Sequence, residues 1–181
     1  QIKSSLGNST DIIIREVSIG EAHDQKAAII YTDGLADDKV ISNFILESVL
    51  FDAKTISDAA QGTIPALKDI VLTVGDVKTV ADFDQLYTSL LSGDAIILLD
   101  EHDQCIAAST RGWKGRAVAE PSAESIVRGP REAFTESLRT NTALIRRKIK
   151  SPNLWMETRQ IGRETRTDVA IMYIHGIANE K

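Results

Sequence analysis

The chain has 181 residues, of which 43% are hydrophobic and 26% charged, and this composition is ordinary for a globular protein of one domain or two small ones. Its single cysteine, Cys105, excludes an internal disulfide and favours a reducing compartment, and no apolar run approaches the roughly 20 residues of a membrane span. The net charge of -5 is unevenly spread, because residues 1–110 hold 7 basic and 18 acidic residues whereas residues 111–181 hold 14 and 8, which favours two units or one unit with oppositely charged faces.

Two strands are predicted near the start of the chain, at Ile12–Ile19 and Ala27–Thr32. The second strand is continuously apolar, so we expect it at the centre of a sheet with both faces buried. Gly34 follows at a sharp turn. Asp33 also lies at this turn, where α/β folds often place active-site residues, but a turn residue that caps backbone groups is the favoured interpretation.

Helices follow the first strand pair. Asp37 can cap a helix from Asp38 to about Val49, since apolar side chains recur there at helical spacing. Residues 64–72 form a second, less regular candidate.

The segment TVADFDQLYTSLLSG predicts a third helix, with Thr79 and Asp82 spaced like a capping box and Gly93 at its end. Ala95–Asp100 and Gln104–Ser109 then predict a hairpin. Alternating helices and strands indicate an α/β unit with a mixed sheet.

A polar linker, residues 111–128, leads to a basic helix that begins at Gly129-Pro130, because proline is favoured at the first helical position. Its predicted apolar stripe consists of Phe134, Leu138, Ile145 and Ile149. Another side carries mixed charges: Arg139, Arg146, Lys150, Glu132 and Glu136. Glu136 and Arg139 are spaced to pair.

Arg131 and Asn141 fall along the apolar stripe, where a buried polar group needs a hydrogen-bonding partner. Arg128 and Arg131 also lie at the positive end of the helix dipole, so an anion should compensate them. The candidates are Glu120 or Glu124, which we favour, and an anion from a ligand or partner. Nucleic acid is a poor candidate, because the chain is acidic and no aromatic residues alternate with the arginines.

The first strand pair has a second copy. Residues 11–37 align with residues 153–179 at a constant offset of 142, which predicts strands at Leu154–Ile161 and Val169–Ile174. The second copy stops at Lys181 directly after its strands, and the chain begins at Gln1 without a signal-peptide pattern, so we expect neighbouring segments to be missing.

The predicted fold is therefore α/β, with two related subdomains that have mixed sheets. Residues 1–110 form the first subdomain, residues 111–128 the linker, and residues 129–181 the opening of a second, incomplete one. The candidate binding or interface residues are Arg128, Arg131, Arg139, Asn141 and Arg146.

Catalytic and metal-binding patterns are missing from the sequence. His23, His102 and His175 are far apart and none has metal-ligand spacing with Cys105. Neither a nucleophile motif nor a phosphate-binding glycine pattern is present. We therefore expect neither an enzyme nor a bound cofactor or metal.

Several stretches resemble the N-terminal hydrophilic domain of spore germinant receptor A subunits, the GerA family: RGPREAFTESLRTNTALIRRKIK, YTDGLAD, LLSGDAIILLDEHDQCIAASTRGW and VAIMYIHGIAN. The similarity extends from about Ile12 to Asn179. One departure is Ala133, where the family usually has glycine, and it leaves the helix intact.

The resemblance implies a soluble domain of a membrane-bound receptor that senses nutrients and triggers spore germination with B and C subunits. It also implies a downstream membrane domain and a place in the spore inner membrane, and the lone cysteine favours the spore-core side. We expect a non-enzymatic domain for signalling and assembly, in which the basic helix locks the two units together and contacts other subunits, further A subunits or anionic lipid. The alternative is a germinant-binding domain with a small-molecule cleft between the two subdomains.

Overall fold

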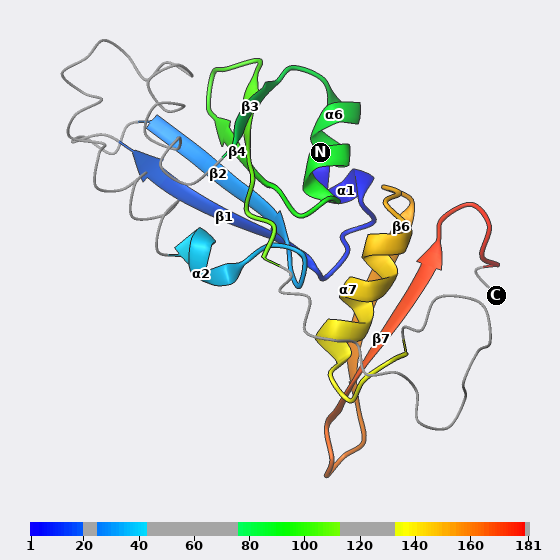
Figure 1. The fold of residues 1–181 in the computed structure, drawn as a ribbon. Helices are drawn as coiled ribbons and strands as arrows, with labels where there is room; N and C mark the ends of the chain where they lie inside the picture. The colour runs from blue at the N-terminus through cyan, green and yellow to red at the C-terminus, as the bar shows by residue number, and fades with distance from the viewer. Residues whose placement is uncertain (20–24, 43–75, 113–132, 180–181) are drawn as a thin grey trace.

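The structure is a computed structural model that describes residues 1–19, 25–42, 76–112 and 133–179 (Figure 1). Its strands are β1 (Ile12–Ile19), β2 (Gln25–Thr32), β3 (Val77–Val80), β4 (Ala95–Leu99), β5 (Cys105–Ala108), β6 (Leu154–Ile161) and β7 (Thr167–Ile174). Its helices are α1 (Ile2–Ser5), α2 (Asp38–Val40), α6 (Phe83–Leu90) and α7 (Leu138–Lys148). The predicted α/β class is confirmed.

The first five strands form one sheet in the order β1-β2-β4-β5-β3, and β6 and β7 form a separate two-stranded sheet. Every strand pair in the described ranges is antiparallel, where mixed sheets were predicted. The reason is the place of β5. The β3-α6-β4 connection does join two parallel strands, but β5 lies between them and is antiparallel to both.

β2 is an inner strand, as predicted, because it pairs with β1 on one side and β4 on the other. Its side chains alternate between two apolar clusters, one on each face of the sheet. Ile29 is 0% exposed in one cluster and Ile30 is 1% exposed in the other. A strand buried on both faces needs apolar residues at successive positions, which explains the uninterrupted run in the sequence.

The predicted capping box at Thr79 is wrong, because Thr79 lies within β3. Asp82 is itself the N-cap of α6 and accepts a 2.7 Å hydrogen bond from the backbone N–H of Gln85. Both Thr79 and Asp82 are residue types that cap helices, so the sequence alone allows either one. The pairing of β3 with β5 places Thr79 in a strand and leaves Asp82 as the cap. Gly93 does end this segment, at a φ of 97° that favours glycine.

The helix predicted after Asp37 begins as expected. The Asp37 carboxylate accepts hydrogen bonds from the N–H groups of Lys39, at 2.9 Å, and Val40, at 3.5 Å. Residues 43–49 of that helix and the candidate helix at 64–72 lie outside the described residues.

The two strand pairs have the same pairing register at the predicted offset of 142. Ile12 pairs with Thr32 as Leu154 pairs with Ile174, and the match continues to the far end of both pairs. The backbone agrees beyond the strands: Gly34 has a φ of 79° and Gly176 a φ of 83°. The two strand pairs therefore have the same register and the same glycine conformation after the second strand, as the sequence repeat predicted.

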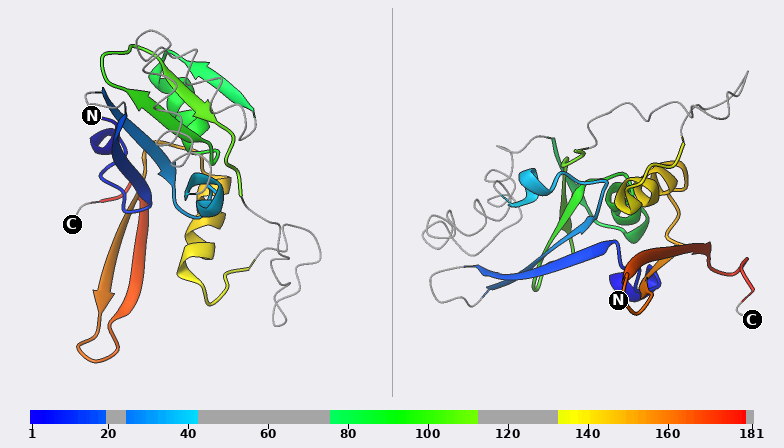
Figure 2. Two further views of the ribbon diagram at one scale, coloured as in Figure 1. Left: turned by 90° about the vertical axis from the view of Figure 1, so that its left-hand side faces the viewer. Right: turned by 90° about the horizontal axis from the view of Figure 1, so that it is seen from below.

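The surroundings of the two copies differ. β7 pairs only with β6 among the described residues, and Ile171 is 49% exposed although its counterpart Ile29 is fully buried. Figure 2 shows the β6–β7 ribbon extending away from the five-stranded sheet. The expectation of an inner strand buried on both faces thus applies to β2 and is wrong for β7 in this structure.

The basic helix, α7, begins at Leu138 rather than at Gly129-Pro130. Residues 133–137 are not helical, and Phe134, predicted on the apolar stripe, is 69% exposed. Ser137 caps the helix by accepting a 3.3 Å hydrogen bond from the N–H of Thr140. Because Ser137 caps the helix, α7 begins nearer the C-terminus than the spacing of apolar residues had indicated.

Cys105 lies in β5 with 5% of its surface exposed. Its burial and the nearby Asp82 carboxylate raise the pKa of the thiol from 9.0 to about 11. The neutral thiol is favoured, so the thiolate fraction at pH 8 should fall about 100-fold relative to an exposed cysteine. We expect a disulfide reagent such as DTNB to modify the native chain at least that much more slowly than the urea-unfolded chain, with a rate that rises as the pH approaches 11. Equal rates in the two states would contradict this assignment.

Candidate functional site

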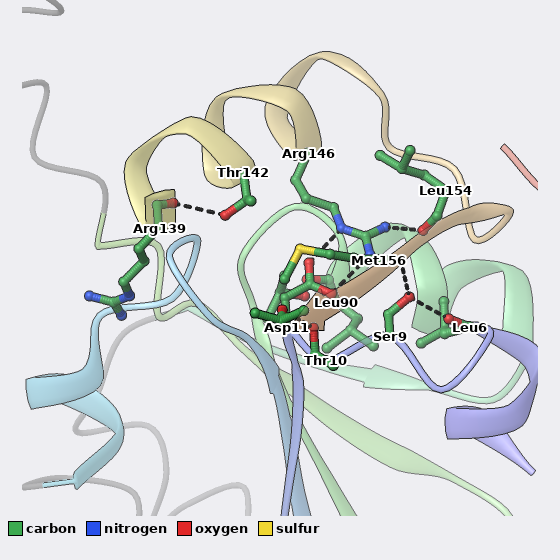
Figure 3. A network of polar contacts seen from close by, with 12 residues as sticks. Leu6, Ser9, Thr10, Asp11, Leu90, Arg139, Thr142, Arg146, Leu154 and Met156 are labelled. Atoms are coloured by element: carbon green, nitrogen blue, oxygen red, sulfur yellow. Dashed lines mark hydrogen bonds and ion pairs between the residues drawn. The ribbon is translucent and has the colours of Figure 1, made fainter. Parts of the chain in front are cut away.

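Arg146, on α7, lies at the centre of the junction between the two sheets (Figure 3). Its side chain is completely buried, with 0% exposure. Nε donates to Oδ2 of Asp11 at 2.7 Å and Nη2 donates to Oδ1 at 3.0 Å, and Nη1 donates to the carbonyl oxygen of Leu154 at 2.5 Å. This two-pronged geometry is the strongest form of an arginine–carboxylate contact.

The segment before β1 holds Asp11 in place. The N–H of Thr10 donates to the carbonyl of Met156 at 3.1 Å, and the N–H of Met156 donates to Oγ of Ser9 at 3.0 Å. Oγ of Ser9 in turn donates to the carbonyl of Leu6 at 2.6 Å. Residues 9 and 10 therefore hydrogen-bond to the edge of β6 that β7 leaves free, and they connect the β6–β7 sheet to the segment before β1.

Gly7 permits an aromatic side chain to close the same junction. A Cβ atom at Gly7 would lie only 2.0 Å from Cδ2 of Trp155, and the φ of Gly7 is 65°. Trp155 lies on β6 and stacks on His175 with ring centroids 3.9 Å apart and planes inclined by 10°. The absence of a side chain at Gly7 is thus a condition for the seating of Trp155.

Arg139 makes a second, more exposed contact between the units. Its Nε donates to Oδ1 of Asp33 at 2.8 Å and its Nη2 donates to Oδ2 of Asp38 at 2.5 Å. The hydrogen bond to Asp33 is the main cause that raises the pKa of Arg139. The Arg139 side chain is 50% exposed, so this ion pair contributes little stability on its own.

The predicted site residues divide into three groups. Arg139 and Arg146 lie on one side of α7, as their spacing indicated, but Arg139 pairs with Asp33 and Asp38, so the predicted pairing with Glu136 is wrong. Arg128 and Arg131, with the compensating carboxylates proposed for them, lie outside the described residues.

Asn141, the third group, finds its hydrogen-bonding partner locally. Oδ1 accepts from the N–H of Thr135 at 2.7 Å and from its Oγ1 at 3.3 Å, and Nδ2 donates to the carbonyl of Thr135 at 2.7 Å. Asn141 therefore fastens the segment that leads into α7 and does not contact the first unit through these bonds.

Sequence reasoning missed the partners in the first unit. Asp11 gave one signal, its position directly before an apolar strand, and Asp33 was interpreted as a turn residue. Gly7 stands in a polar segment, LGNST, where a glycine is unremarkable. No pattern within the first unit could indicate contacts made across 101 to 148 residues of sequence.

This arrangement is suited to holding two units together. Each donor of the Arg146 guanidinium that faces the junction has an acceptor, and both oxygens of Asp11 are occupied. A carboxylate engaged in this way is not available as a general base. The candidate site is therefore a junction built on a buried charge pair, with Arg139 at its exposed margin.

The Gly7 contact gives a matched experiment. Gly7→Ala should destabilise the chain through both the positive φ and the overlap with Trp155, whereas Gly176→Ala meets the same φ constraint with no atom within 4 Å. We expect Gly7→Ala to lower the free energy of unfolding by about 1–3 kcal/mol more than Gly176→Ala, as measured by urea unfolding. Equal losses would show that Trp155 does not depend on Gly7.

Within the described ranges, no helix combines the length and apolar character needed to cross a bilayer.

Known proteins similar to this chain include several spore germination proteins. A family model described as Bacillus/Clostridium GerA spore germination protein matches residues 1–181. Spore germination protein KA of Bacillus subtilis (strain 168) is 41% identical over 181 residues, which cover 100% of this chain and 33% of that protein. Spore germination protein B1 of the same organism is 31% identical over 177 residues, covering 98% and 36%. The chain thus spans about a third of the length of these relatives.

The fold agrees with a solved structure, the N-terminal domain of the A subunit of the Bacillus megaterium spore germinant receptor GerK3. The TM-score is 0.77 at 37% sequence identity, over 99% of this chain and 64% of that one. The resemblance inferred from the arginine-rich block and the strand motifs is confirmed. This chain belongs to the GerA family of spore germination proteins.

Proposed function

We propose that this chain is the N-terminal domain of a membrane-bound nutrient germinant receptor subunit, and that it acts in receptor assembly and signal transduction without catalysing a reaction. The matched family and the GerK3 A-subunit domain support the receptor role. The observation that carries the assembly role is the buried pair of Arg146 and Asp11, which joins residues from both units.

In this proposal the protein has two subdomains, residues 1–110 and 129–181, and α7 fixes their relative orientation. Arg111 belongs structurally with the first of them, because it pairs with Asp94 at 2.7 Å and bridges to Ala36. Partners would be receptor B and C subunits and other A subunits, and the domain would lie on the core side of the spore inner membrane. A fixed orientation would let a change in one subdomain reach the other and the membrane part beyond.

The alternative expected from the sequence, a ligand cleft between the two subdomains, has less support. The contact that joins the subdomains is filled by Arg146, which is 0% exposed, and by Asp11, which is 4% exposed. A ligand that entered there would have to displace a buried charge pair in which each guanidinium nitrogen donates a hydrogen bond.

The buried pair and the exposed pair should differ sharply in their effect on stability. Arg146→Met leaves the Asp11 carboxylate buried without a partner and should lower the free energy of unfolding by about 3–5 kcal/mol. Arg139→Ala removes a half-exposed pair and should cost no more than about 1 kcal/mol. Urea unfolding of both variants, with Asp11→Asn and the Asp11→Asn/Arg146→Met double variant, measures the coupling. A loss for Arg146→Met no larger than that for Arg139→Ala would refute the central role of the buried pair.

A charge exchange tests the function in spores. In the full-length subunit, Arg139→Asp places three carboxylates together and should reduce nutrient germination or the receptor level. Adding Asp33→Arg to that variant returns an arginine to the cluster, beside Asp38 and the carboxylate introduced on α7, and should recover both. Arg159→Ala, at an exposed site that pairs within β6, serves as the control. Normal germination in spores with Arg139→Asp, or no recovery with the exchange, would count against the assembly role.

A further inference from the structure

The loop between β2 and α2, residues 33–38, contacts the chain on both sides of residues 113–132. Before that stretch, the N–H of Gly112 donates to the carbonyl of Leu35 at 3.3 Å. After it, Arg139 pairs with two carboxylates of the same loop. The chain thus lies at one loop of the first unit both at Gly112 and at Arg139, so the stretch between them does not have to span a distance between the two units.

Two glycines allow close packing at this loop. A Cβ atom at Gly112 would lie only 2.0 Å from Cβ of Asp37. A Cβ atom at Gly34 would lie 3.1 Å from Cβ of Ala143, on α7, and 3.3 Å from the carbonyl oxygen of Arg139. Both glycines therefore let the backbone approach its neighbour more closely than a residue with a side chain would.

Two carboxylate sites of the first unit match two arginines of α7. Arg139 and Arg146 are about two helical turns apart on one side of the helix. Arg139 meets Asp33 and Asp38, and Arg146 meets Asp11. The backbone N–H of Asp33 donates to the carbonyl of Asp11 at 2.8 Å, so a hydrogen bond within the first unit sets the spacing of the two sites.

A second element, β6, also contacts the first unit. Both backbone groups of Met156 bond to the segment before β1, through Oγ of Ser9 and the N–H of Thr10. The hydroxyl oxygens of Thr10 and Thr158 lie 2.7 Å apart. Since α7 and β6 each contribute contacts, the junction fixes the orientation of the second unit as well as its position.

We propose that this face of the first unit is a self-sufficient docking surface whose partner is the α7–β7 module, residues 138–174, and that the module stays bound when the chain is cut within residues 113–132. The inference rests on the proposed assembly role and deepens it, because it places recognition wholly in the contacts between the units. The covalent connection then only raises the local concentration of the module. The kind of partner that fits the surface is a helix with two arginines two turns apart, followed by a strand with a free edge.

Charge supports this partner. Residues 1–110 are acidic overall and residues 111–181 are basic, and the contacts join carboxylates of the former to arginines of the latter. Opposite charges speed the encounter of two molecules and disfavour wrong orientations. The two-pronged contact of Arg146 with Asp11 adds directional selectivity, because both oxygens of the carboxylate must face the guanidinium.

Cutting the folded chain tests the proposal, and neither piece then has to fold alone. A recognition sequence for a site-specific protease is inserted within residues 113–132, and the cut chain is run on a size-exclusion column at about 10 μM. We expect the two pieces to elute together, at the volume of the uncut chain. The cut Arg159→Ala variant should behave in the same way, because Arg159 pairs within β6.

Two further variants show which contacts hold the pieces together. Arg139→Ala removes a half-exposed pair and should weaken the binding of the cut pieces no more than about fivefold. Arg146→Met leaves a buried carboxylate without its partner and should weaken the binding at least about 100-fold, so that the pieces elute apart. Dispersed amide spectra before cutting show that each variant is folded.

Separate elution of the wild-type pieces would overturn the proposal, and so would binding of the Arg146→Met pieces as tight as that of the wild type. If the wild-type pieces separate while Arg146→Met still destabilises the uncut chain, the assembly role stands and only self-sufficient docking is wrong.

Lengthening the connection is a second measurement, and it needs no cut. Doubling the stretch between Gly112 and Arg139 with a Gly-Ser sequence should change the unfolding equilibrium constant only about threefold if contacts alone hold the units. Urea unfolding of the lengthened and the original chain measures this change. A change of more than about tenfold would show that the connection itself positions the second unit, and would overturn the proposal.

Discussion

The structure depends on one buried charge pair, Arg146 with Asp11. A guanidinium without solvent exposure is costly unless a partner neutralises it and its nitrogens are hydrogen-bonded. Here Asp11 supplies the opposite charge, and with the carbonyl of Leu154 it gives each guanidinium nitrogen an acceptor. The pair fixes the relative position of α7 and the start of β1 more than it adds net stability, because the cost of removing both charges from water offsets much of their attraction. Since its members come from two units, the low-energy state of either side chain requires the other unit in one fixed position.

A repeated strand pair contributes to both sides of this junction. The two strand pairs have one register and one type of glycine turn, yet the first lies in a five-stranded sheet and the second in a ribbon. In each copy a helix precedes the first strand: α1 before β1, and α7 before β6. The helix of the second copy is longer and carries Arg139 and Arg146. These two arginines pair with Asp33 and Asp11 of the first copy. Basic residues of the C-terminal part of the chain thus pair with acidic residues of the N-terminal part.

The sequence predicted those features that depend on local spacing. Apart from β3, which was not predicted, the strand positions follow from periodicity and agree with the structure. So do the repeat offset, the Asp37 cap and the shared side of Arg139 and Arg146. Sequence reasoning failed where distant pairing decides. Thr79 lies in β3 because β3 pairs with β5. The start of α7 is a different case, because a local cap at Ser137 sets it at Leu138 where the apolar pattern indicated an earlier start. The partners of α7, above all Asp11 and Asp33, are more than 100 residues away, and no local rule selects one carboxylate among so many.

The corner after the second strand of each copy has a wider consequence. At this corner the backbone N–H of Asp33 donates to the carbonyl of Asp11, and that of His175 donates to the carbonyl of Asn153, so main-chain atoms alone define the bend. The side chains of Asp33 and His175 are therefore not needed for these backbone hydrogen bonds and can make other contacts. In the first copy the side chain is that of Asp33, which pairs with Arg139. In the second copy it is that of His175, which stacks on Trp155. The two copies thus have different contacts at matching corners: an ion pair, which salt weakens, and an aromatic stack, which salt affects little.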